Sequence, residues 1–275
     1  MGYKDSVELA YKIRRHALDM TSRGGTAHIG GIFSMADIVA VLYADVLHYD
    51  AKNPRMPERD RIVLSKGHAG AGIYAALAES GFFPVSELDT HCQNGSRLSG
   101  HVSHKGVPGV EVSTGSLGQG MPMAMGMAMV AKLDGKQHNV FCIIGDGECD
   151  EGAIWESALI AAQYKLDNFI VTVDFNKIQS LGPIDETIRL EPLDQKWASF
   201  GWHVIRIDGH DHAALHRAYA EALAARGQGK PIVVIADTVK GKGVSFMENK
   251  VLWHYRIARG EEYDAALKEL EAQKP

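Results

Sequence analysis

The stretch Val140-Phe-Cys-Ile-Ile-Gly-Asp-Gly147 decides the fold of this 275-residue chain. Its uninterrupted apolar run, from Val140 to Ile144, is typical of a strand buried on both faces of a parallel sheet. Asp146 then lies at the carboxyl end of that strand, where open α/β sheets form their ligand crevice. Gly147 lets the backbone approach an anion closely, and the start of the next helix points N–H groups toward it. The stretch therefore predicts a parallel sheet with an anion site directly after this strand.

A second strand ends in a similar way. The segment Asn168-Phe-Ile-Val-Thr-Val-Asp174 is also apolar enough to be buried, and Asn176 follows shortly after it. The carboxyl ends of parallel strands meet at one edge of a sheet, so we expect Asp146 and Asn176 to lie close together. They offer two hard oxygens, which Mg²⁺ accepts together with phosphate oxygens. A lone Gly-Asp-Gly is often only a tight turn, but the pair of strand ends favours a magnesium–diphosphate site.

The order of the remaining elements indicates the fold class. Further strands are expected at 61–65, 202–208 and 231–236, and helices at 6–22, 117–132, 152–165, 212–226 and 260–273, with an alanine-rich helix ending near Ser80. Strands that alternate with helices predict an α/β fold with a doubly wound, mainly parallel sheet and helices on both faces. Ser34-Met-Ala-Asp37 is interpreted as a capping box that opens a further helix. No internal repeat or linker interrupts the pattern, so we expect residues 1–275 to form a single domain.

Composition and charge exclude several classes of protein. A formal net charge of −5 leaves no basic footprint for nucleic acid, and three cysteines indicate thiols in a cytoplasmic protein rather than a disulfide framework. The richest apolar run, Met121 to Ala131, is shorter than the roughly 18 residues of a membrane span. Charged residues begin the chain where a signal peptide would be apolar, and the match of Met1–Ser6 to a myristoylation pattern is of a kind that often arises by chance. We therefore expect neither nucleic acid nor a membrane as partner.

Histidines are numerous, and their placement matters more than their total of thirteen. Four of the five that stand out lie beside a glycine or within two residues of one, where loops approach ligands; the five are His28, His68, His101, His104 and His254. Imidazoles can donate to phosphate or relay protons from hydroxyls. Any one of them is more often a satisfied core or surface side chain, but the set favours a site. A zinc site at His101 and His104 lacks a third ligand at a sensible spacing.

Several segments leave alternatives open. Residues 94–120 form a long tract with few apolar residues, which is either a binding loop or disorder. Within it, Gly115-Ser-Leu-Gly-Gln-Gly120 begins a helix and could hold a phosphate or make a tight helix–helix contact. Met121–Val130 alternates large and small side chains and suits the core and a subunit interface about equally.

Two acidic segments have simple structural explanations. Glu148 and Asp150 lie at a helix start, where carboxylates complement the helix dipole. In Gly209-His-Asp-His212, the carboxylate of Asp211 is best explained as the cap of the helix that follows.

Taken together, these motifs resemble the N-terminal, diphosphate-binding part of transketolase, a thiamine diphosphate enzyme. The resemblance covers nearly the whole chain, in the order of the family, and its motifs are together highly specific. They are Ala27-His-Ile-Gly-Gly31, Leu64-Ser-Lys-Gly-His-Ala69, Ser99-Gly-His101, Pro108-Gly-Val-Glu-Val-Ser-Thr-Gly-Ser-Leu-Gly-Gln-Gly120, Gly145-Asp-Gly147 with Asn176, and Trp253-His254.

The resemblance implies a role for each matching residue. Magnesium, with Ca²⁺ or Mn²⁺ as a substitute, would be held by Asp146, Asn176 and the backbone carbonyl of Ile178. The cofactor would contact His68, Gly115, Leu117, Gly147, Glu151, Asn176 and His254, with Leu117 supporting its bent form. The sugar would face His28 and His101, which with His254 are the candidate catalytic residues. Glu151 and Glu156 match acids of a carboxylate network at the family's subunit interface.

The chain also departs from the family. Transketolases usually continue into a pyrimidine-binding domain, which carries the glutamate that activates the cofactor, and a further C-terminal domain, whereas this chain ends at Pro275. We therefore expect one subunit of a split transketolase, inactive alone and completed by a C-terminal subunit in an α2β2 heterotetramer. It would transfer a two-carbon ketol unit from a ketose or ketose phosphate to an aldose.

Two local differences and two other functions remain to be weighed. Ile29 follows His28 where the family commonly has proline, and Tyr255-Arg256 follows His254 where glycine is usual, so the sugar could be an unusual one. A deoxyxylulose-phosphate synthase or a 2-oxo acid dehydrogenase α subunit would keep the cofactor, but the histidines favour ketol transfer. A non-catalytic scaffold usually loses a metal ligand, and Asp146 and Asn176 are both present.

Overall fold

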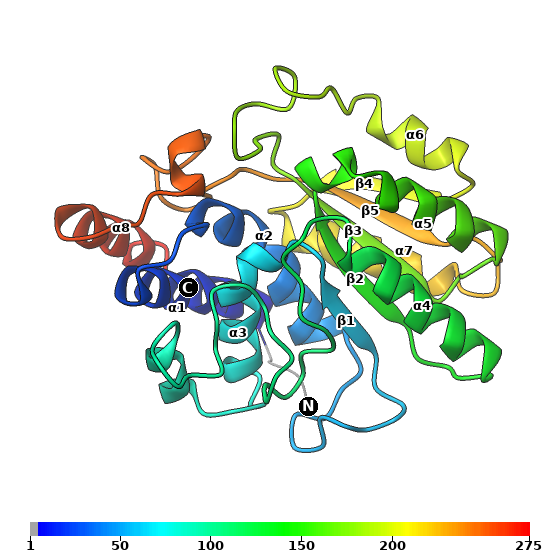
Figure 1. Cartoon of the computed structure of the whole chain (residues 1–275), viewed down its shortest axis with the longest axis horizontal. Coiled ribbons are helices and arrows are strands. Elements are labelled where there is room, and N and C mark those ends of the chain that lie inside the picture. The colour runs from blue at the N-terminus through cyan, green and yellow to red at the C-terminus, as the bar shows by residue number, and fades with distance from the viewer. Residues whose placement is uncertain (1–4) are drawn as a thin grey trace.

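Five parallel strands form the sheet at the centre of the computed structural model, which describes residues 5–275 (Figure 1). The spatial order is β1-β2-β3-β5-β4, and all neighbouring pairs are parallel. The strands are β1 (Arg61–Leu64), β2 (Val140–Gly145), β3 (Phe169–Phe175), β4 (His203–Asp208) and β5 (Ile232–Asp237). The predicted fold class is confirmed, and every predicted strand is present within a residue or so of its expected ends.

The helices cover both faces of this sheet, as expected (Figure 1). They are α1 (Ser6–Gly24), α2 (Ile29–Val41), α3 (Gly70–Glu79), α4 (Gly120–Leu133), α5 (Gly152–Gln163), α6 (Leu193–Ser199), α7 (His212–Ala224) and α8 (Glu261–Glu271). A π-helical turn, η1 (Leu42–Val46), and four 3₁₀ turns complete them: η2 (Gly67–Ala69), η3 (Val85–Thr90), η4 (Gly147–Asp150) and η5 (Val251–His254). The sequence did not predict α6.

Alternation along each strand divides the core into two layers, because successive side chains point to opposite faces. In β2, Phe141 and Ile143 join the layer formed with α1, α2, α3 and α7, whereas Cys142 and Ile144 join the layer formed with α4, α5 and α6. Both layers are dry, since all four of these side chains are at most 1% exposed. The continuous apolar run that predicted a strand buried on both faces is explained by these two layers.

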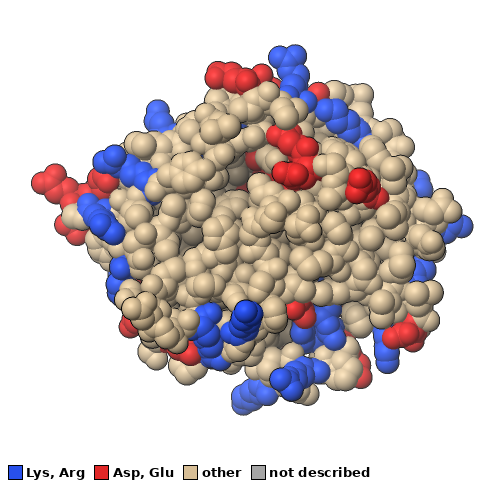
Figure 2. Space-filling model, viewed as in Figure 1, with Lys and Arg blue, Asp and Glu red and all other residues tan. Residues whose placement is uncertain are grey.

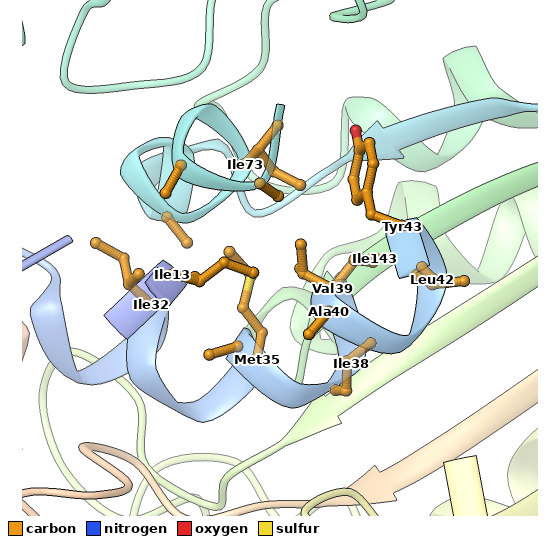
Figure 3. Packing of buried hydrophobic residues seen from close by; sticks show 14 of the residues in the cluster. Ile13, Ile32, Met35, Ile38, Val39, Ala40, Leu42, Tyr43, Ile73 and Ile143 are labelled. Carbon is orange, nitrogen blue, oxygen red and sulfur yellow. The ribbon is translucent and has the colours of Figure 1, made fainter. Parts of the chain in front are cut away.

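The helical stretch Ile29–Val46, which joins α2 to η1, is long and apolar enough to cross a membrane by length and composition, and 83% of it is buried within the fold. The expectation that no apolar run approaches that length was therefore wrong. Figure 3 shows its side chains packed against Ile13 of α1, Ile73 of α3 and Ile143 of β2. A helix surrounded by other elements is apolar all round, which explains its composition.

The predicted capping box at Ser34 and Asp37 was also wrong, because α2 begins at Ile29 and both residues lie inside it. Their side chains bind across the interior instead of at a helix end. The Ser34 hydroxyl donates to Asp174 at 2.6 Å, and the carboxylate of Asp37 pairs with Arg14 at 2.6 Å. Because the helix begins at Ile29, the amides that a box at Ser34 would cap lie beyond the first turn and can bond within the helix.

Three other expectations are settled by packing. The tract 94–120 is an ordered loop held down by buried Leu98 and Val102, so the disorder alternative was wrong. In α4, Met121 and Ala128 are fully buried, which confirms the core interpretation for one helix face. The cap formed by Asp211 is confirmed, since its side chain accepts hydrogen bonds from the first amides of α7. Of the myristoylation pattern, residues 1–4 lie outside the described residues.

Candidate cofactor and substrate site

A cavity of about 250 Å³ lies at the carboxyl ends of the strands, where the sequence placed it. Ten of the eleven predicted site residues line it: His28, His68, His101, Gly115, Leu117, Asp146, Gly147, Asn176, Ile178 and His254. Figure 2 shows a hollow on this face of the molecule, with acidic side chains along one edge. Segments from nearly the whole length of the chain therefore meet at one opening.

The three predicted metal ligands come together at the ends of β2 and β3. Asp146 and Asn176 are only 4% and 5% exposed. Both carboxylate oxygens of Asp146 are held by backbone amides, one from Gly147 at 2.7 Å and the other from Lys177. Lys177 has a left-handed backbone (φ 68°), and this turn brings Ile178 back toward Asn176, whose side-chain oxygen accepts the Ile178 amide at 3.2 Å.

These donors suit a hard cation. One carboxylate, one amide oxygen and one backbone carbonyl are the oxygen types that Mg²⁺ accepts, and a diphosphate could complete its six ligands. Within residues 5–275, no three His, Cys, Asp or Glu side chains are grouped as a metal site, so the zinc alternative at His101 and His104 gains no third ligand. His104 is exposed and its ring bonds instead to the Ser113 hydroxyl at 2.8 Å.

Two buried lysines also line the cavity, and the sequence indicated no role for them. Lys66 follows β1 and donates to Asp174 and to the carbonyl of Gly31. Lys240 follows β5 and donates to the carbonyl of Ile178 at 2.8 Å and to Nδ1 of His254 at 2.9 Å. The available signal was their position just after a strand, which is the same signal that identified Asp146.

Burial shifts the pKa values of the charged groups at this end of the cavity. Burial, aided by the charge of Asp174, raises the pKa of Asp146 to about 6. Burial likewise lowers the pKa of Lys240 to about 8, although the charge of Asp146 opposes that change. A divalent cation with a polyanion would restore solvation to both kinds of group, so the chemistry of the donor set fits a magnesium–diphosphate.

Four histidine rings, which we call the histidine group, surround the other part of the cavity: His28, His68, His101 and His254. The ring centroid of His28 lies 4.9 Å from those of His68 and His254 and 5.8 Å from that of His101. Each ring comes from a different segment of the chain. The prediction that these four gather at one place is confirmed, whereas His104, the fifth histidine considered, does not line the cavity.

Three members of the histidine group, His28, His68 and His254, have lowered pKa values. Burial, followed by the charge of neighbouring His101, lowers the pKa of His28 to about 4. Burial and the charge of Lys240 lower the pKa of His254 to about 3, and burial with Lys66 holds the pKa of His68 well below its usual value. The buried Nδ1 of His28 has no hydrogen-bond partner. A neutral imidazole with an unused nitrogen can accept or donate a proton once a hydroxyl arrives.

The backbone of His28 is held in an unusual conformation. Its φ of 78° lies in the left-handed region, which costs a residue with a Cβ atom of the order of 1 kcal/mol or more. The amide of His28 donates to the carbonyl of His254 at 2.9 Å, and this bond joins the two segments. Strain retained beside a cavity is typical of a functional position.

The loop before α4 contributes the predicted Gly115 and Leu117. A Cβ atom at Gly115 would lie only 2.9 Å from the ring of His101, and one at Gly118 only 2.8 Å from Glu151. Glycine is therefore required for the close approach of this loop to its neighbours. Leu117 is half-buried and lines the cavity, while Glu151, predicted as a cofactor contact, does not line it and is exposed at the start of α5.

Glu148 differs from its predicted role at a helix start. It is 1% exposed, and its carboxylate accepts the amides of Gly118 at 2.8 Å and Gly145 at 3.3 Å together with the Ser65 hydroxyl. Burial raises its pKa despite these bonds. The helix-dipole interpretation was wrong for this residue, because its side chain points inward and joins the loop before α4 to the end of β2.

Comparisons with known proteins match this chain to transketolases over most of its length. A family model described as "Transketolase, thiamine diphosphate binding domain" matches residues 6–271. The 6-deoxy-6-sulfo-D-fructose transketolase subunit SqwG of Clostridium sp. (strain MSTE9) is 44% identical over 261 residues, which are 95% of this chain and 94% of that protein. An apulose-4-phosphate transketolase subunit of Actinobacillus succinogenes is 42% identical over 274 residues, which are 98% of this chain and 97% of that protein.

Longer relatives match over only part of their length. Human transketolase is 37% identical over 248 residues, which are 90% of this chain and 39% of that protein. The crystal structure of transketolase from Campylobacter jejuni has a TM-score of 0.89 and 32% identity, and the match covers 97% of this chain and 42% of that chain. The chain thus spans about two fifths of these longer proteins and nearly the whole of the two shorter ones.

Proposed function

The chain belongs to the transketolase family of transferases, and we propose that it is the diphosphate-binding subunit of a transketolase divided between two chains. The observation that carries this proposal is the match over nearly the full length of both this chain and two transketolase subunits. The proposed reaction transfers a two-carbon ketol unit from a ketose or ketose phosphate to an aldose. Since longer transketolases extend well beyond the matched region, a separate C-terminal subunit would supply the pyrimidine-binding domain and the activating glutamate.

The cavity fits thiamine diphosphate with its diphosphate at the charged end. Asp146, Asn176 and the carbonyl of Ile178 would hold Mg²⁺, or Ca²⁺ or Mn²⁺ in its place. Gly147 has no side chain, so it would let the diphosphate approach the backbone closely, and the ammonium groups of Lys66 and Lys240 would balance the negative charge. When bound, thiamine diphosphate supplies a nucleophilic carbon and an electron sink for the ketol unit.

The remaining lining residues would orient the cofactor and exclude water. His68 is half-buried and its pKa is held low, so as a neutral imidazole it can donate to a phosphate oxygen without adding a further charge. Leu117 and Gly115 would support the rings, since the loop that carries them is held in place by close contacts. Glu151 would act from the rim, because it lies outside the cavity.

The histidine group would handle the sugar. His28 and His101 would hold sugar hydroxyls, and the free Nδ1 of His28 would accept or return the hydroxyl proton as a carbon–carbon bond is cleaved or formed. His254 would act beside them, since its ring contacts that of His28. The lowered pKa values of His28 and His254 keep these imidazoles unprotonated, so each can accept a hydrogen bond from an arriving hydroxyl.

The partner would dock on the side of the molecule that carries α4 and α5. Glu151 and Glu156 are exposed there, and Leu159 and Ile160 of α5 are 58% and 39% exposed. Figure 2 shows a broad area with few charges on this side. Exposed apolar side chains beside acidic ones suit a protein interface. This proposal takes up the subunit-interface alternative for Met121–Val130 and applies it to the outer face of α4. We propose an α2β2 heterotetramer, and the cytoplasmic location remains a prediction.

Reconstitution with the C-terminal subunit, thiamine diphosphate and Mg²⁺ tests the proposal. We expect an aldose to become longer by two carbons only when a ketose donor and both chains are present. Donor sugars would be screened together with pyruvate, which the related synthases and 2-oxo acid dehydrogenases use. Turnover by this chain alone, or consumption of pyruvate without ketol transfer, would overturn it.

A further inference from the structure

Tyr255 lies at the entrance of the cavity, beside the histidine group. Its ring centroid is 4.7 Å from that of His254 and 5.9 Å from that of His28. The side chain lines the cavity and is nevertheless 61% exposed, which places it at the open side of the cavity. A large aromatic side chain at this place meets any molecule that reaches His28.

The backbone that carries Tyr255 is firmly held. The carbonyl of His254 accepts the amide of His28, and the amide of Tyr255 donates to the carbonyl of Leu252 at 3.2 Å. Trp253 between them is 3% exposed, and its indole donates to the carbonyl of Phe246 at 3.0 Å. The ring of Tyr255 is therefore placed relative to His28 by rigid neighbours rather than by a mobile loop.

The neighbouring Arg256 does not share this position. Its guanidinium forms two short bonds with the carboxylate of Glu262 and lies 5.9 Å from the ring of Trp253. It does not line the cavity. Of the two residues that follow His254, Tyr255 lines the cavity and Arg256 does not.

The phenol group of Tyr255 is free to bind. Within residues 5–275 its hydroxyl makes no hydrogen bond, although the ring rests against two imidazoles. A phenol presents an apolar face and a polar tip, which match the C–H face and the hydroxyls of a sugar.

We propose that Tyr255 is a specificity-determining residue that selects sugars by the length and hydroxyl pattern of the chain passing the entrance. Its ring forms one wall of the passage, and its hydroxyl hydrogen-bonds a sugar hydroxyl. This inference rests on the proposed function, since it concerns the sugar of that same reaction. A hydrogen bond at a partly exposed position discriminates modestly, by roughly threefold to tenfold.

The test compares Tyr255→Phe and Tyr255→Gly with the parent in the reconstituted two-chain enzyme. A panel of ketoses and aldoses that differ in one hydroxyl or one carbon provides kcat and KM for each. Tyr255→Phe should raise KM about threefold to tenfold for sugars that carry the recognised hydroxyl, with kcat changed less than twofold. Tyr255→Gly should alter the order of preference among chain lengths. Neither should change the affinity for thiamine diphosphate.

Leu252→Ala is the matched control, because Leu252 is 58% exposed on the same turn but does not line the cavity. It should keep the parent's order of sugars. If the ratios of kcat/KM across the panel were the same in the parent and in both Tyr255 variants, the inference would be overturned while the proposed function stood. A parent enzyme that turned over no ketose would overturn the proposed function instead.

Discussion

Two clusters of histidines in this molecule differ in how their imidazole nitrogens are hydrogen-bonded. The histidine group surrounds the cavity, whereas His210 and His212 surround the carboxylate of Asp37, which also pairs with Arg14; we call this second set the Asp37 cluster. In the Asp37 cluster each imidazole nitrogen has a partner. His210 accepts the amide of Val239 at 2.8 Å, so its other nitrogen carries a proton and donates to Asp37 at 2.7 Å.

The bonds of the Asp37 cluster join segments that are distant in sequence. His212 binds Ser6 at 2.8 Å and Asp37 at 3.2 Å, and the guanidinium of Arg14 binds both carboxylate oxygens, with only its Nε lacking a partner. At the cavity, by contrast, Nδ1 of His28 has no partner at all. A histidine whose nitrogens are all bonded within the protein has a structural role. A histidine with an unpartnered nitrogen beside a cavity is a candidate for binding or catalysis.

The charges of the two clusters differ as well. Burial alone would raise the pKa of Asp37, but the charge of Arg14 and the hydrogen bonds from both histidines outweigh it and hold that pKa well below its usual value. The Asp37 cluster is therefore a charged pair at neutral pH, while burial lowers the pKa values of His28, His68 and His254 in the histidine group. Substitutions should consequently change stability in one region and activity in the other.

The largest expected effect is that of Asp146→Ala in the cavity. Loss of the one carboxylate among the metal donors should abolish magnesium-dependent binding of thiamine diphosphate, and with it activity, in the reconstituted enzyme. Calorimetric titration measures the binding, and gel filtration should show that assembly is retained. Asp134→Ala, at an exposed carboxylate after α4, is the control and should bind normally. Unchanged activity in the Asp146 variant would refute the site.

His28→Asn should lower kcat/KM about 10²-fold to 10⁴-fold, the range expected when a proton-transfer group is removed. The melting temperature should hardly change, because asparagine tolerates the left-handed backbone at this position. His104→Asn is the matched control, since His104 is exposed and lies outside the cavity. A large loss of stability with normal turnover would instead place His28 with the structural histidines.

Asp37→Ala should lower the free energy of unfolding by about 3–5 kcal/mol, because it leaves the buried guanidinium of Arg14 without its partner. Urea unfolding of the chain measures this loss, while KM of the surviving folded enzyme should stay the same. Replacing both members of the pair, Arg14→Met with Asp37→Leu, should recover part of the lost stability. A change below about 1 kcal/mol for the single variant would contradict the assignment.

The smallest expected effect is the change with pH in the contribution of Asp37 to the free energy of unfolding. Since the pKa of Asp37 is lower in the folded chain than its unfolded value of about 3.9, its contribution to stability is fully present above about pH 4. It should be lost as the pH falls below that value toward the folded pKa. The difference in unfolding free energy between the parent and Asp37→Asn should therefore shrink only under acid conditions. A difference that grew on acidification would show the opposite sign of linkage.

The sequence predicted the sheet well, because strands buried on both faces leave continuous apolar runs that little else produces. Asp146 and Asn176 were found for the same reason, since a strand end gives a position in space. Ser34 and Asp37 were wrongly predicted to form a capping box, because a local sequence pattern does not show their partners across the interior. Lys66 and Lys240 were missed although each follows a strand, because lysines are mostly exposed and the sequence does not show that these two are buried.

The apolar stretch Ile29–Val46 has a further consequence during synthesis of the chain from its N-terminus to its C-terminus. This stretch packs against α1, α3 and α7, and α7 ends 178 residues after it (224 − 46). At roughly 5–20 residues per second, synthesis of that interval takes about 9–36 s. During that time one side of a segment long enough to enter a membrane has no native cover. Nascent chains stalled before α7 should therefore bind a hydrophobic dye or a chaperone more than the complete chain does.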